Sequence, residues 1–318
     1  MSEEKKFEHV KIEWPIVKDE QGNFIKGTID GNYAVISINR PDSLNALTEQ
    51  TVSEISGALR LMELDNSVRA VVLRGTKDIT KKPSFSVGAD LAAAIGGGKL
   101  NPSIPVHMAI AMRLRHREYD EIEQFSKPLI AAVDGFALGG GLELTLACDI
   151  VIATDRSRFG LPEVNRGIIP ANGGVSRMAA RIGVNRALRM CMFGEHHDAK
   201  TMQDWGYVSW VAPAGEEFEK IVHEKAKWFG EAATTALYVI KNCIKFGTQH
   251  PQIGLIMEQI GFGMNAGGFD MKEGILAFNR KVKCPVCKGK GKFEDGTKCE
   301  NCGGRRKLKD KPHFKGFA

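Results

Sequence analysis

Two glutamates stand in glycine-rich settings that suit chemistry on an acyl thioester. Glu143 ends the run Gly135-Phe-Ala-Leu-Gly-Gly-Gly-Leu-Glu143, and Glu163 follows Pro162. Upstream, Phe85-Ser-Val-Gly-Ala-Asp90 forms a small-residue turn after an expected strand. Because glycine permits close approach and unusual dihedral angles, both turns could aim free backbone N–H groups at one carbonyl oxygen. Two such donors and two carboxylates could stabilise an enolate and move protons, which indicates an enzyme.

Each glutamate also has a simpler explanation. A glutamate near a helix start, such as Glu143, commonly favours the helix dipole and faces water. Glu163, after a proline, could be a solvated loop acid. The presence of both glycine-rich turns favours the chemical interpretation.

The elements that must position these residues alternate between strands and helices. Strands are expected over 10–12, 25–29, 33–38, 68–74, 129–133 and 150–154, and helices over 48–62, 106–125 and 142–147. Asp30-Gly31-Asn32 predicts a hairpin between the second and third strands. Repeated strand-then-helix units predict an α/β fold with sheets covered by helices.

Composition limits the class of protein. The chain has 318 residues, of which 43% are hydrophobic and 26% charged, as in ordinary globular domains. No apolar run approaches the roughly 20 residues that span a bilayer, so no membrane partner is expected. The charged N-terminal segment, which contains Trp14-Pro15, lacks the features of a signal peptide. The expected location is the cytoplasm.

The positive charge belongs to the C-terminal tail. The whole chain carries +6, whereas residues 281–318 hold twelve Lys and Arg against four Asp and Glu, which leaves 6 − 8 = −2 for the rest. Four of the seven cysteines also lie there, as two C-x-x-C pairs separated by eleven residues: Cys284, Cys287, Cys299 and Cys302. This spacing predicts a structural four-cysteine zinc site, with a redox role for the pairs as the alternative.

Several motifs together resemble the crotonase (enoyl-CoA hydratase/isomerase) superfamily. They are Asn39-Arg-Pro41, Leu44-Asn-Ala-Leu47, Gly88-Ala-Asp90, Gly139-Gly-Gly-Leu-Glu143, Cys148-Asp149, Pro162-Glu163, Gly167-Ile-Ile-Pro170 and Gly173-Gly174. The resemblance is ordered, correctly spaced and runs from about residue 30 to 281. The tail also resembles a zinc repeat of the DnaJ chaperones, although its second half departs at Arg305-Arg306.

The resemblance implies a particular architecture. It predicts a spiral of ββα units with a helical C-terminal region and a small zinc-binding hairpin, assembled as a homotrimer or homohexamer. It divides the chain into an N-terminal strand extension (1–30), a crotonase core (31–215), a helical region for trimerisation and CoA covering (216–281) and a basic four-cysteine zinc module (282–318).

The resemblance also implies site residues. Backbone N–H groups of Ala89 and Gly140 would hold the thioester oxygen, and Glu143 and Glu163 would hold a water molecule between them. Coenzyme A, as part of the substrate, would contact the following residues: Ala46, Ala89, Leu91, Phe278 and Lys281. No redox cofactor is implied.

Lys281 lies three residues before the first tail cysteine. One hypothesis is therefore that the basic tail attracts the CoA phosphates, and the alternative is that it is a rigid peg for assembly. An RNA-binding role is not favoured, because aromatic residues for base stacking are few there, and so no nucleic-acid partner is expected. A scaffold that hands acyl-CoA to a partner enzyme stays open.

Two departures from the family concern the acyl group. Ala171 stands where the family often has glycine, and it is followed by Asn172, whose side chain could reach the acyl pocket. Ala92 falls where some hydratases place a lysine. The favoured reaction is hydration of a 2-enoyl-CoA to a 3-hydroxyacyl-CoA. The alternatives are double-bond isomerisation and hydrolysis of a cyclic oxo-acyl-CoA, the latter because residues 14–23 faintly resemble ring-opening hydrolases.

Overall fold

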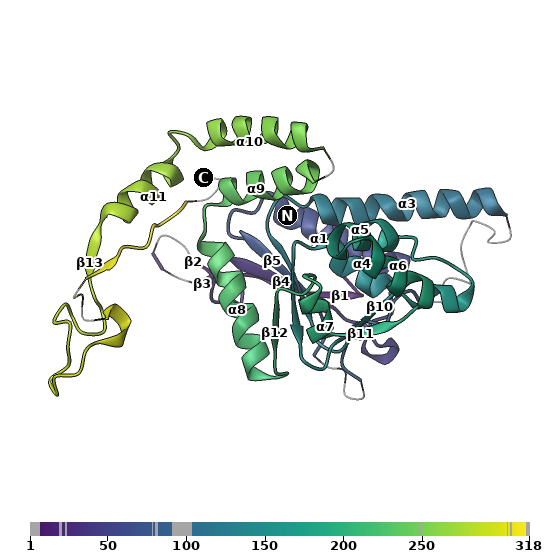
Figure 1. Ribbon diagram of the computed structural model, residues 1–318, viewed down its shortest axis with the longest axis horizontal. Helices are drawn as coiled ribbons and strands as arrows, with labels where there is room; N and C mark the ends of the chain where they lie inside the picture. The colour runs from purple at the N-terminus through teal and green to yellow at the C-terminus, as the bar shows by residue number, and fades with distance from the viewer. Residues whose placement is uncertain are drawn as a thin grey trace. The chain divides into compact units, whose positions relative to one another are not determined.

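The computed structural model describes residues 7–18, 21–22, 24–77, 79, 82–90, 104–248, 250–303, 305 and 307–315 (Figure 1). The chain divides into two compact units, Met1–Gly230 and Glu231–Ala318, and each is described by itself. Among these residues, no helix is both long and apolar enough to cross a bilayer.

A six-stranded sheet forms the centre of the first unit. Its strands, in spatial order, are β1 (Val10–Glu13), β4 (Tyr33–Ile38), β5 (Ala70–Gly75), β7 (Leu129–Val133), β9 (Ile150–Thr154) and β12 (Trp210–Ala212). Only the pair β1–β4 is antiparallel. The central strands are continuous apolar runs because both of their faces are buried.

Three strands of a second sheet each follow directly after a strand of the first sheet. Its order is β11 (His196–Asp198), β10 (Arg158–Gly160), β8 (Phe136–Leu138) and β6 (Ser84–Ser86). Thus β5 is followed by β6, β7 by β8, and β9 by β10. Each repeat therefore consists of one strand in each sheet, and helical segments come after each pair of strands. This arrangement agrees with the predicted α/β class of ββα units.

Helices cover both faces of the six-stranded sheet. Within the described residues, the helical segments of the first unit are η1 (Pro41–Ser43), α1 (Glu49–Glu63), α3 (Pro105–Gln124), α4 (Gly140–Ala147), η2 (Pro162–Arg166), α5 (Gly174–Ile182), α6 (Val184–Phe193), α7 (Ala199–Asp204) and α8 (Glu216–Glu231). One face, which includes Ile36 and Leu73, packs with α1, α3, α4 and the second sheet. The other, which includes Val35 and Val72, packs against α8.

The predicted hairpin between residues 25–29 and 33–38 is wrong. The strand β3 (Phe24–Lys26) pairs instead with β2 (Val17–Lys18), and β4 pairs with β1 and β5. The segment before the Asp30 turn is bound by the 14–16 segment, since the Ile29 amide donates to the Trp14 carbonyl at 3.1 Å. The turn residues favour a hairpin locally, but the fully buried β4 requires strand neighbours on both edges.

The described residues of the second unit form three α-helices, a short 3-10 helix and a small ribbon. These are α9 (Thr234–Gly247), α10 (Pro251–Asn265), α11 (Phe269–Asn279), β13 (Lys281–Lys283), η3 (Glu300–Cys302) and β14 (Lys307–Lys309). The helices α9 and α10 approach closely at a pair of glycines, because a Cβ on Gly254 would lie 2.7 Å from the Gly247 Cα. The strands β13 and β14 pair antiparallel.

Candidate active site

The turn after β6 presents the amide of Ala89. A short parallel bridge joins Leu47 to Ala89: the Leu47 amide donates to the Gly88 carbonyl and the Asp90 amide donates to the Leu47 carbonyl, both at 2.8 Å. These two hydrogen bonds use the Gly88 carbonyl and the Asp90 amide, and the Ala89 N–H takes no part in them. Gly88 has a φ of +96°, and a Cβ there would lie 2.8 Å from the Leu138 carbonyl oxygen, so glycine is required.

The turn between β8 and α4 faces it. Gly139, with a φ of +51°, precedes the helix, and Gly140 is its first residue. The N–H of a first helical residue has no partner within the helix. A Cβ on Gly140 would lie 3.6 Å from the Ala89 nitrogen, and one on Gly88 would lie 3.3 Å from the Gly140 nitrogen. The structure therefore brings the amides of Ala89 and Gly140 together on two facing turns.

Glu143 lies in the same short helix and is only 1% exposed. Its carboxylate accepts three hydrogen bonds: from the Asn172 amide at 2.6 Å, the Asn172 Nδ2 at 3.0 Å and the Gly174 amide at 3.0 Å. Burial raises the pKa of Glu143, and these donors oppose the rise, the Asn172 side chain most. The solvated-helix explanation for Glu143 is therefore wrong.

Glu163 lies in η2 and reaches the same region. Its Oε1 would be 2.7 Å from a Cβ on Gly139, the residue that precedes α4. Its Oε2 is buried and has no hydrogen-bond partner among the described residues. Burial, and then the repulsion of the Glu143 carboxylate, raise the pKa of Glu163 to about 7. The two glutamates thus lie near each other, but only Glu143 accepts hydrogen bonds from other described residues.

Asn172 lies beside the first glutamate. It binds Glu143 with both its backbone and its side-chain N–H groups, while its Oδ1 is buried without a described partner. The sequence did single out Asn172 as a polar residue beside the Gly173-Gly174 turn, but local pattern could not identify its acceptor, which is 29 residues away.

Two supporting residues were missed by the sequence analysis. Arg177 donates to the Asn172 carbonyl at 2.9 Å and to Asp120 and Glu123 of α3, so it ties the 172–174 turn to that helix. Tyr119, only 1% exposed, donates to the Gly140 carbonyl at 3.3 Å. Neither residue belongs to a motif that could have indicated its role.

The expected CoA contacts are distributed over both units. Ala46 is buried and immediately precedes Leu47, which bridges to Ala89. Leu91 lies outside the described residues. Phe278 and Lys281 lie in the second unit, at the end of α11 and the start of β13, and both are exposed.

The four tail cysteines converge. Their sulfur atoms all lie within 4.8 Å of one another, and the pairs Cys284–Cys299 and Cys287–Cys302 are each separated by 3.8 Å. Four thiolates at about 2.3 Å from a tetrahedral zinc would be about 3.8 Å apart. The Gly291 amide and the Asn301 Nδ2 donate to two of the sulfurs, as donors around a metal thiolate site do. The donor set fits a tetrahedral metal such as zinc.

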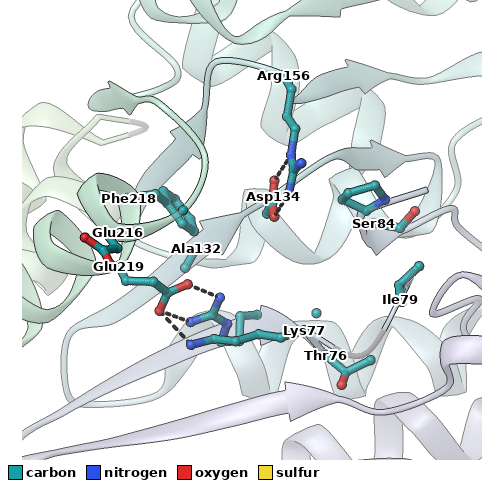
Figure 2. A pocket seen from close by; sticks show the side chains of 14 residues that line it. Thr76, Lys77, Ile79, Ser84, Ala132, Asp134, Arg156, Glu216, Phe218 and Glu219 are labelled. Atoms are coloured by element: carbon teal, nitrogen blue, oxygen red, sulfur yellow. Dashed lines mark hydrogen bonds and ion pairs between the residues drawn. The ribbon is translucent and has the colours of Figure 1, made fainter. Parts of the chain in front are cut away.

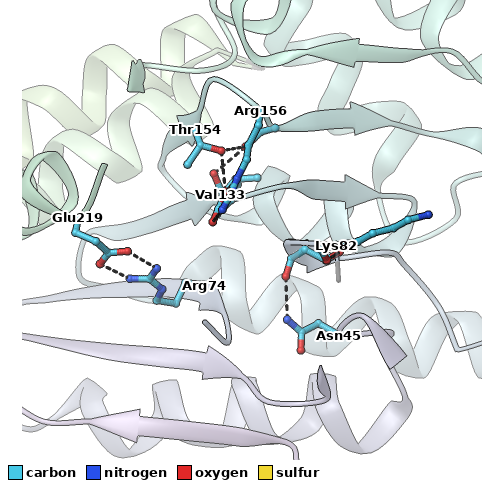
Figure 3. A network of polar contacts seen from close by, with 10 residues as sticks. Asn45, Arg74, Lys82, Val133, Thr154, Arg156 and Glu219 are labelled. Atoms are coloured by element: carbon cyan, nitrogen blue, oxygen red, sulfur yellow. Dashed lines mark hydrogen bonds and ion pairs between the residues drawn. The ribbon is translucent and has the colours of Figure 1, made fainter. Parts of the chain in front are cut away.

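A cavity of about 550 Å³ lies elsewhere in the first unit, near the ends of β5 and β7 (Figure 2). Its charged groups neutralise one another. Arg74 makes a two-pronged pair with Glu219 at 2.9 and 2.7 Å, as Figure 3 shows, and Arg156 makes another with Asp134 at 2.7 and 2.6 Å. Lys77 also contacts Glu219. Because these ions are already paired, we regard the cavity as part of the scaffold.

An apolar pocket of about 300 Å³ begins beside Glu163. Its lining comes from η2, α5, α6 and the 168–170 segment, and includes Val164, Pro170 and Cys191. Burial, and then the carboxylates of Glu163 and Glu143, raise the pKa of the Cys191 thiol to about 11. The charges of both glutamates therefore act on a thiol that lines this pocket.

Comparisons with known proteins agree on one family. Residues 28–287 match the family described as Enoyl-CoA hydratase/isomerase. A Bacillus subtilis protein named probable enoyl-CoA hydratase is 36% identical over 272 residues, 84% of this chain and 99% of that protein. The 2,3-dehydroadipyl-CoA hydratase of Escherichia coli is 33% identical over 258 residues, 80% of this chain and 95% of the relative.

Solved structures agree as well. The crystal structure of an enoyl-CoA hydratase from Bacillus anthracis has a TM-score of 0.73 with 28% sequence identity, and the match covers 85% of this chain and 96% of that one. The family match ends at residue 287, within the first cysteine pair, so most of the tail lies beyond it.

Proposed function

Because the chain belongs to the enoyl-CoA hydratase/isomerase family and is an enoyl-CoA hydratase-like enzyme, we propose that it adds water to a 2-enoyl-CoA through Glu143 and Glu163. The product is a 3-hydroxyacyl-CoA. The proposal assigns each glutamate one proton transfer and assigns the Ala89 and Gly140 amides to the thioester oxygen.

The different surroundings of the glutamates suggest their roles. The three donors on Glu143 favour its ionised form, which can accept a proton from water as the water oxygen attacks the β-carbon. The displaced electron pair moves onto the thioester oxygen, where two N–H donors stabilise the enolate. Glu163, whose pKa of about 7 leaves it partly protonated at neutral pH, then delivers its proton to the α-carbon. Solvent exchange restores both groups.

The observation that carries this proposal is the asymmetry between two neighbouring carboxylates beside a pair of backbone amides. Glu143 is buried and accepts three hydrogen bonds, whereas the buried oxygen of Glu163 has no described donor. This difference would let Glu143 act as a base and Glu163 as an acid at the same pH. A structural ion network would instead place cations on these acids.

The proposal is tested by following the loss of the conjugated thioester absorbance of straight-chain, branched and alicyclic enoyl-CoAs. Wild-type enzyme should hydrate at least one of them. Glu143→Gln and Glu163→Gln should each lower kcat by about 10²–10⁴-fold, since each removes one proton transfer. Glu195→Gln, at an acid paired with Arg189, is the control. Full hydration by either catalytic variant would contradict the scheme.

We also propose that the cysteine cluster binds a structural zinc ion through Cys284, Cys287, Cys299 and Cys302. The buried thiols, their separations and their N–H donors support this assignment. Zinc would supply cross-links that a tail with few buried apolar groups otherwise lacks. It takes no part in the proposed reaction.

Assembly as a homotrimer or homohexamer is part of the same proposal. Many large apolar side chains of α9 and α10 are exposed in the single chain, among them Ile244, Ile256 and Phe262. Exposed apolar surface of this kind is typical of subunit interfaces. Light scattering of the purified protein should give three or six chain masses, and a monomer would contradict the proposal.

A further inference from the structure

The hydroxyl of Tyr119, in α3, is buried and makes only a long hydrogen bond. The residue is 1% exposed, and its hydroxyl donates to the Gly140 carbonyl at 3.3 Å. Hydrogen bonds between a hydroxyl and an oxygen acceptor are usually about 2.5–3.0 Å long. Tyr207, a second buried tyrosine, meets this norm, because its hydroxyl lies 2.6 Å from the Thr145 hydroxyl. The Tyr119 hydroxyl is therefore weakly bound for a group that has lost its contact with water.

This hydroxyl lies beside the two facing turns that present the Ala89 and Gly140 amides. A Cβ on Gly140 would lie 3.6 Å from the Tyr119 hydroxyl oxygen and 3.6 Å from the Ala89 nitrogen. The Gly140 nitrogen is bonded to the same Cα. Of the described side chains, Leu47 comes nearest to that Cβ position, at 3.5 Å, which is an ordinary contact distance. Three donors therefore surround a position that one small group can occupy.

The Tyr119 hydroxyl stays a neutral donor. Burial, and then the Glu143 carboxylate, raise the pKa of Tyr119 well above the ordinary value of a tyrosine. The hydroxyl therefore keeps its proton at neutral pH. The effect of Glu143 also means that this hydroxyl lies within electrostatic reach of the proposed base.

The helix α3 holds the tyrosine ring in place. Asp120 and Glu123, in the same turn of the helix, both accept hydrogen bonds from Arg177. Arg177 also donates to the Asn172 carbonyl, in the turn that binds Glu143. Because a hydroxyl hydrogen rotates about its C–O bond, the tyrosine can change its acceptor without moving its ring.

We propose that Tyr119 is a third hydrogen-bond donor to the thioester oxygen, beside the amides of Ala89 and Gly140. Its O–H turns from the Gly140 carbonyl to that oxygen as the enolate forms, and its proton is not transferred. This inference rests on the proposed function. A hydrogen bond to an ionised acceptor is about twice as strong as one to a neutral acceptor, so this exchange favours the transition state over the bound substrate.

The alternative is a structural role, in which the hydroxyl only fixes the start of α4 through the Gly140 carbonyl. Tyr119→Phe removes the hydroxyl and keeps the ring. With a 2-enoyl-CoA that the wild type hydrates, this variant should lower kcat by about 10²-fold, as the loss of one oxyanion donor does, and change KM by less than about threefold.

Tyr207→Phe is the matched control, because it removes another buried hydroxyl that contacts α4, through Thr145. The control should leave kcat unchanged. Circular dichroism and urea unfolding verify that both variants are folded.

A spectroscopic measurement detects the third donor without any turnover. Acetoacetyl-CoA is a thioester that ionises to an enolate with its own ultraviolet absorbance. Titration of the complex should show that the wild type lowers the pKa of the bound ligand relative to the free ligand. Tyr119→Phe should raise the pKa of the bound ligand by about one unit, which corresponds to tenfold weaker stabilisation of the enolate, and Tyr207→Phe should not change it.

The outcomes separate this inference from the proposed reaction. A wild type that does not lower the pKa of bound acetoacetyl-CoA, an unchanged pKa in Tyr119→Phe, or an equal shift in Tyr207→Phe would overturn the inference. If no enoyl-CoA is hydrated but the shift in Tyr119→Phe persists, the proposed function fails and the third donor stands. If hydration occurs without that shift, the third donor fails.

Discussion

At the scale of residues, the site depends on two chemically identical side chains in unlike surroundings. Glu143 is enclosed by three N–H donors, whereas the buried oxygen of Glu163 has none among the described residues. Burial raises the pKa of both glutamates, and it brings the pKa of Glu163 to about 7. In the proposed mechanism, this difference in hydrogen bonding, and not a difference in residue type, makes Glu143 the base and Glu163 the acid.

The pH dependence of kcat/KM should report Glu163. Because the proposed reaction needs the protonated form of Glu163, activity should decline as the pH rises through about 7. The same group affects stability: its pKa is raised from about 4.5, so the folded state loses stability as the pH rises through that interval. Glu163→Gln should remove this loss in urea unfolding. A pH-independent rate between 6 and 9 would contradict the assignment.

Asn172 should act as a positioning residue for Glu143. Removing its side-chain donor in Asn172→Ala should raise the pKa of Glu143 further, because the ionised form loses one of its three described donors. The acidic limb of the kcat/KM profile should move about one pH unit upward. Asn165→Ala, at an exposed asparagine of η2, is the control. A lower rate with an unshifted limb would indicate a purely structural role.

At the scale of elements, local sequence predicted the parts that local physics determines. The strands at 129–133 and 150–154 occur as expected, and the helix after Thr48 has its predicted cap, with the Thr51 amide donating to the Thr48 hydroxyl at 3.2 Å. The turns with Gly88 and Gly139 are recognisable because only glycine tolerates them.

The misses arise from contacts between distant segments. The pairing of β3 with β2, and the contacts of Asn172 and Arg177, join segments that no single window contains. The helix expected to begin at residue 142 begins at Gly140. The prediction left out the two glycines because glycine has a low helix propensity. These details follow from packing and not from local pattern.

The helix α8 should depend on Glu219 for its docking to β5. Arg74 is 7% exposed and needs this carboxylate, and although burial opposes it, the pairing with Arg74 and Lys77 lowers the pKa of Glu219 to about 2. The stabilisation is thus present above about pH 4.5 and is lost as the pH falls towards 2. Glu219→Gln should lower the free energy of unfolding at pH 7 by about 1–2 kcal/mol.

Urea unfolding measures this effect, with Glu217→Gln as the control, because Glu217 is exposed in the same helical turn. The control should change stability by less than about 0.5 kcal/mol. Equal stability of Glu219→Gln and wild type at pH 7 would show that the pair does not stabilise the docking.

At the scale of the whole molecule, the chain combines a family fold with a cysteine-bearing tail, most of which lies beyond the matched residues. The tail's buried cluster consists of the four cysteines, with Leu308 packed against it. A cluster of this size cannot by itself offset the entropy of ordering the tail, so its fold should require a metal.

Metal analysis should therefore find about one zinc per chain. Cys299→Ser/Cys302→Ser should lose it, because two thiolate ligands are removed, and limited proteolysis should then cleave the tail while the first unit stays intact. Cys243→Ser, at a cysteine of α9 outside the cluster, is the control. Retention of stoichiometric zinc by the double variant would refute the four-cysteine site.

The central claim is tested most directly by the origin of the atoms in the product. Incubation of a 2-enoyl-CoA in deuterium oxide enriched in oxygen-18, followed by mass spectrometry, should show one solvent oxygen on the β-carbon and one deuterium on the α-carbon. That is the outcome of water addition with proton delivery by Glu163. Deuterium without the heavy oxygen, or the heavy oxygen in a free carboxylate, would contradict it.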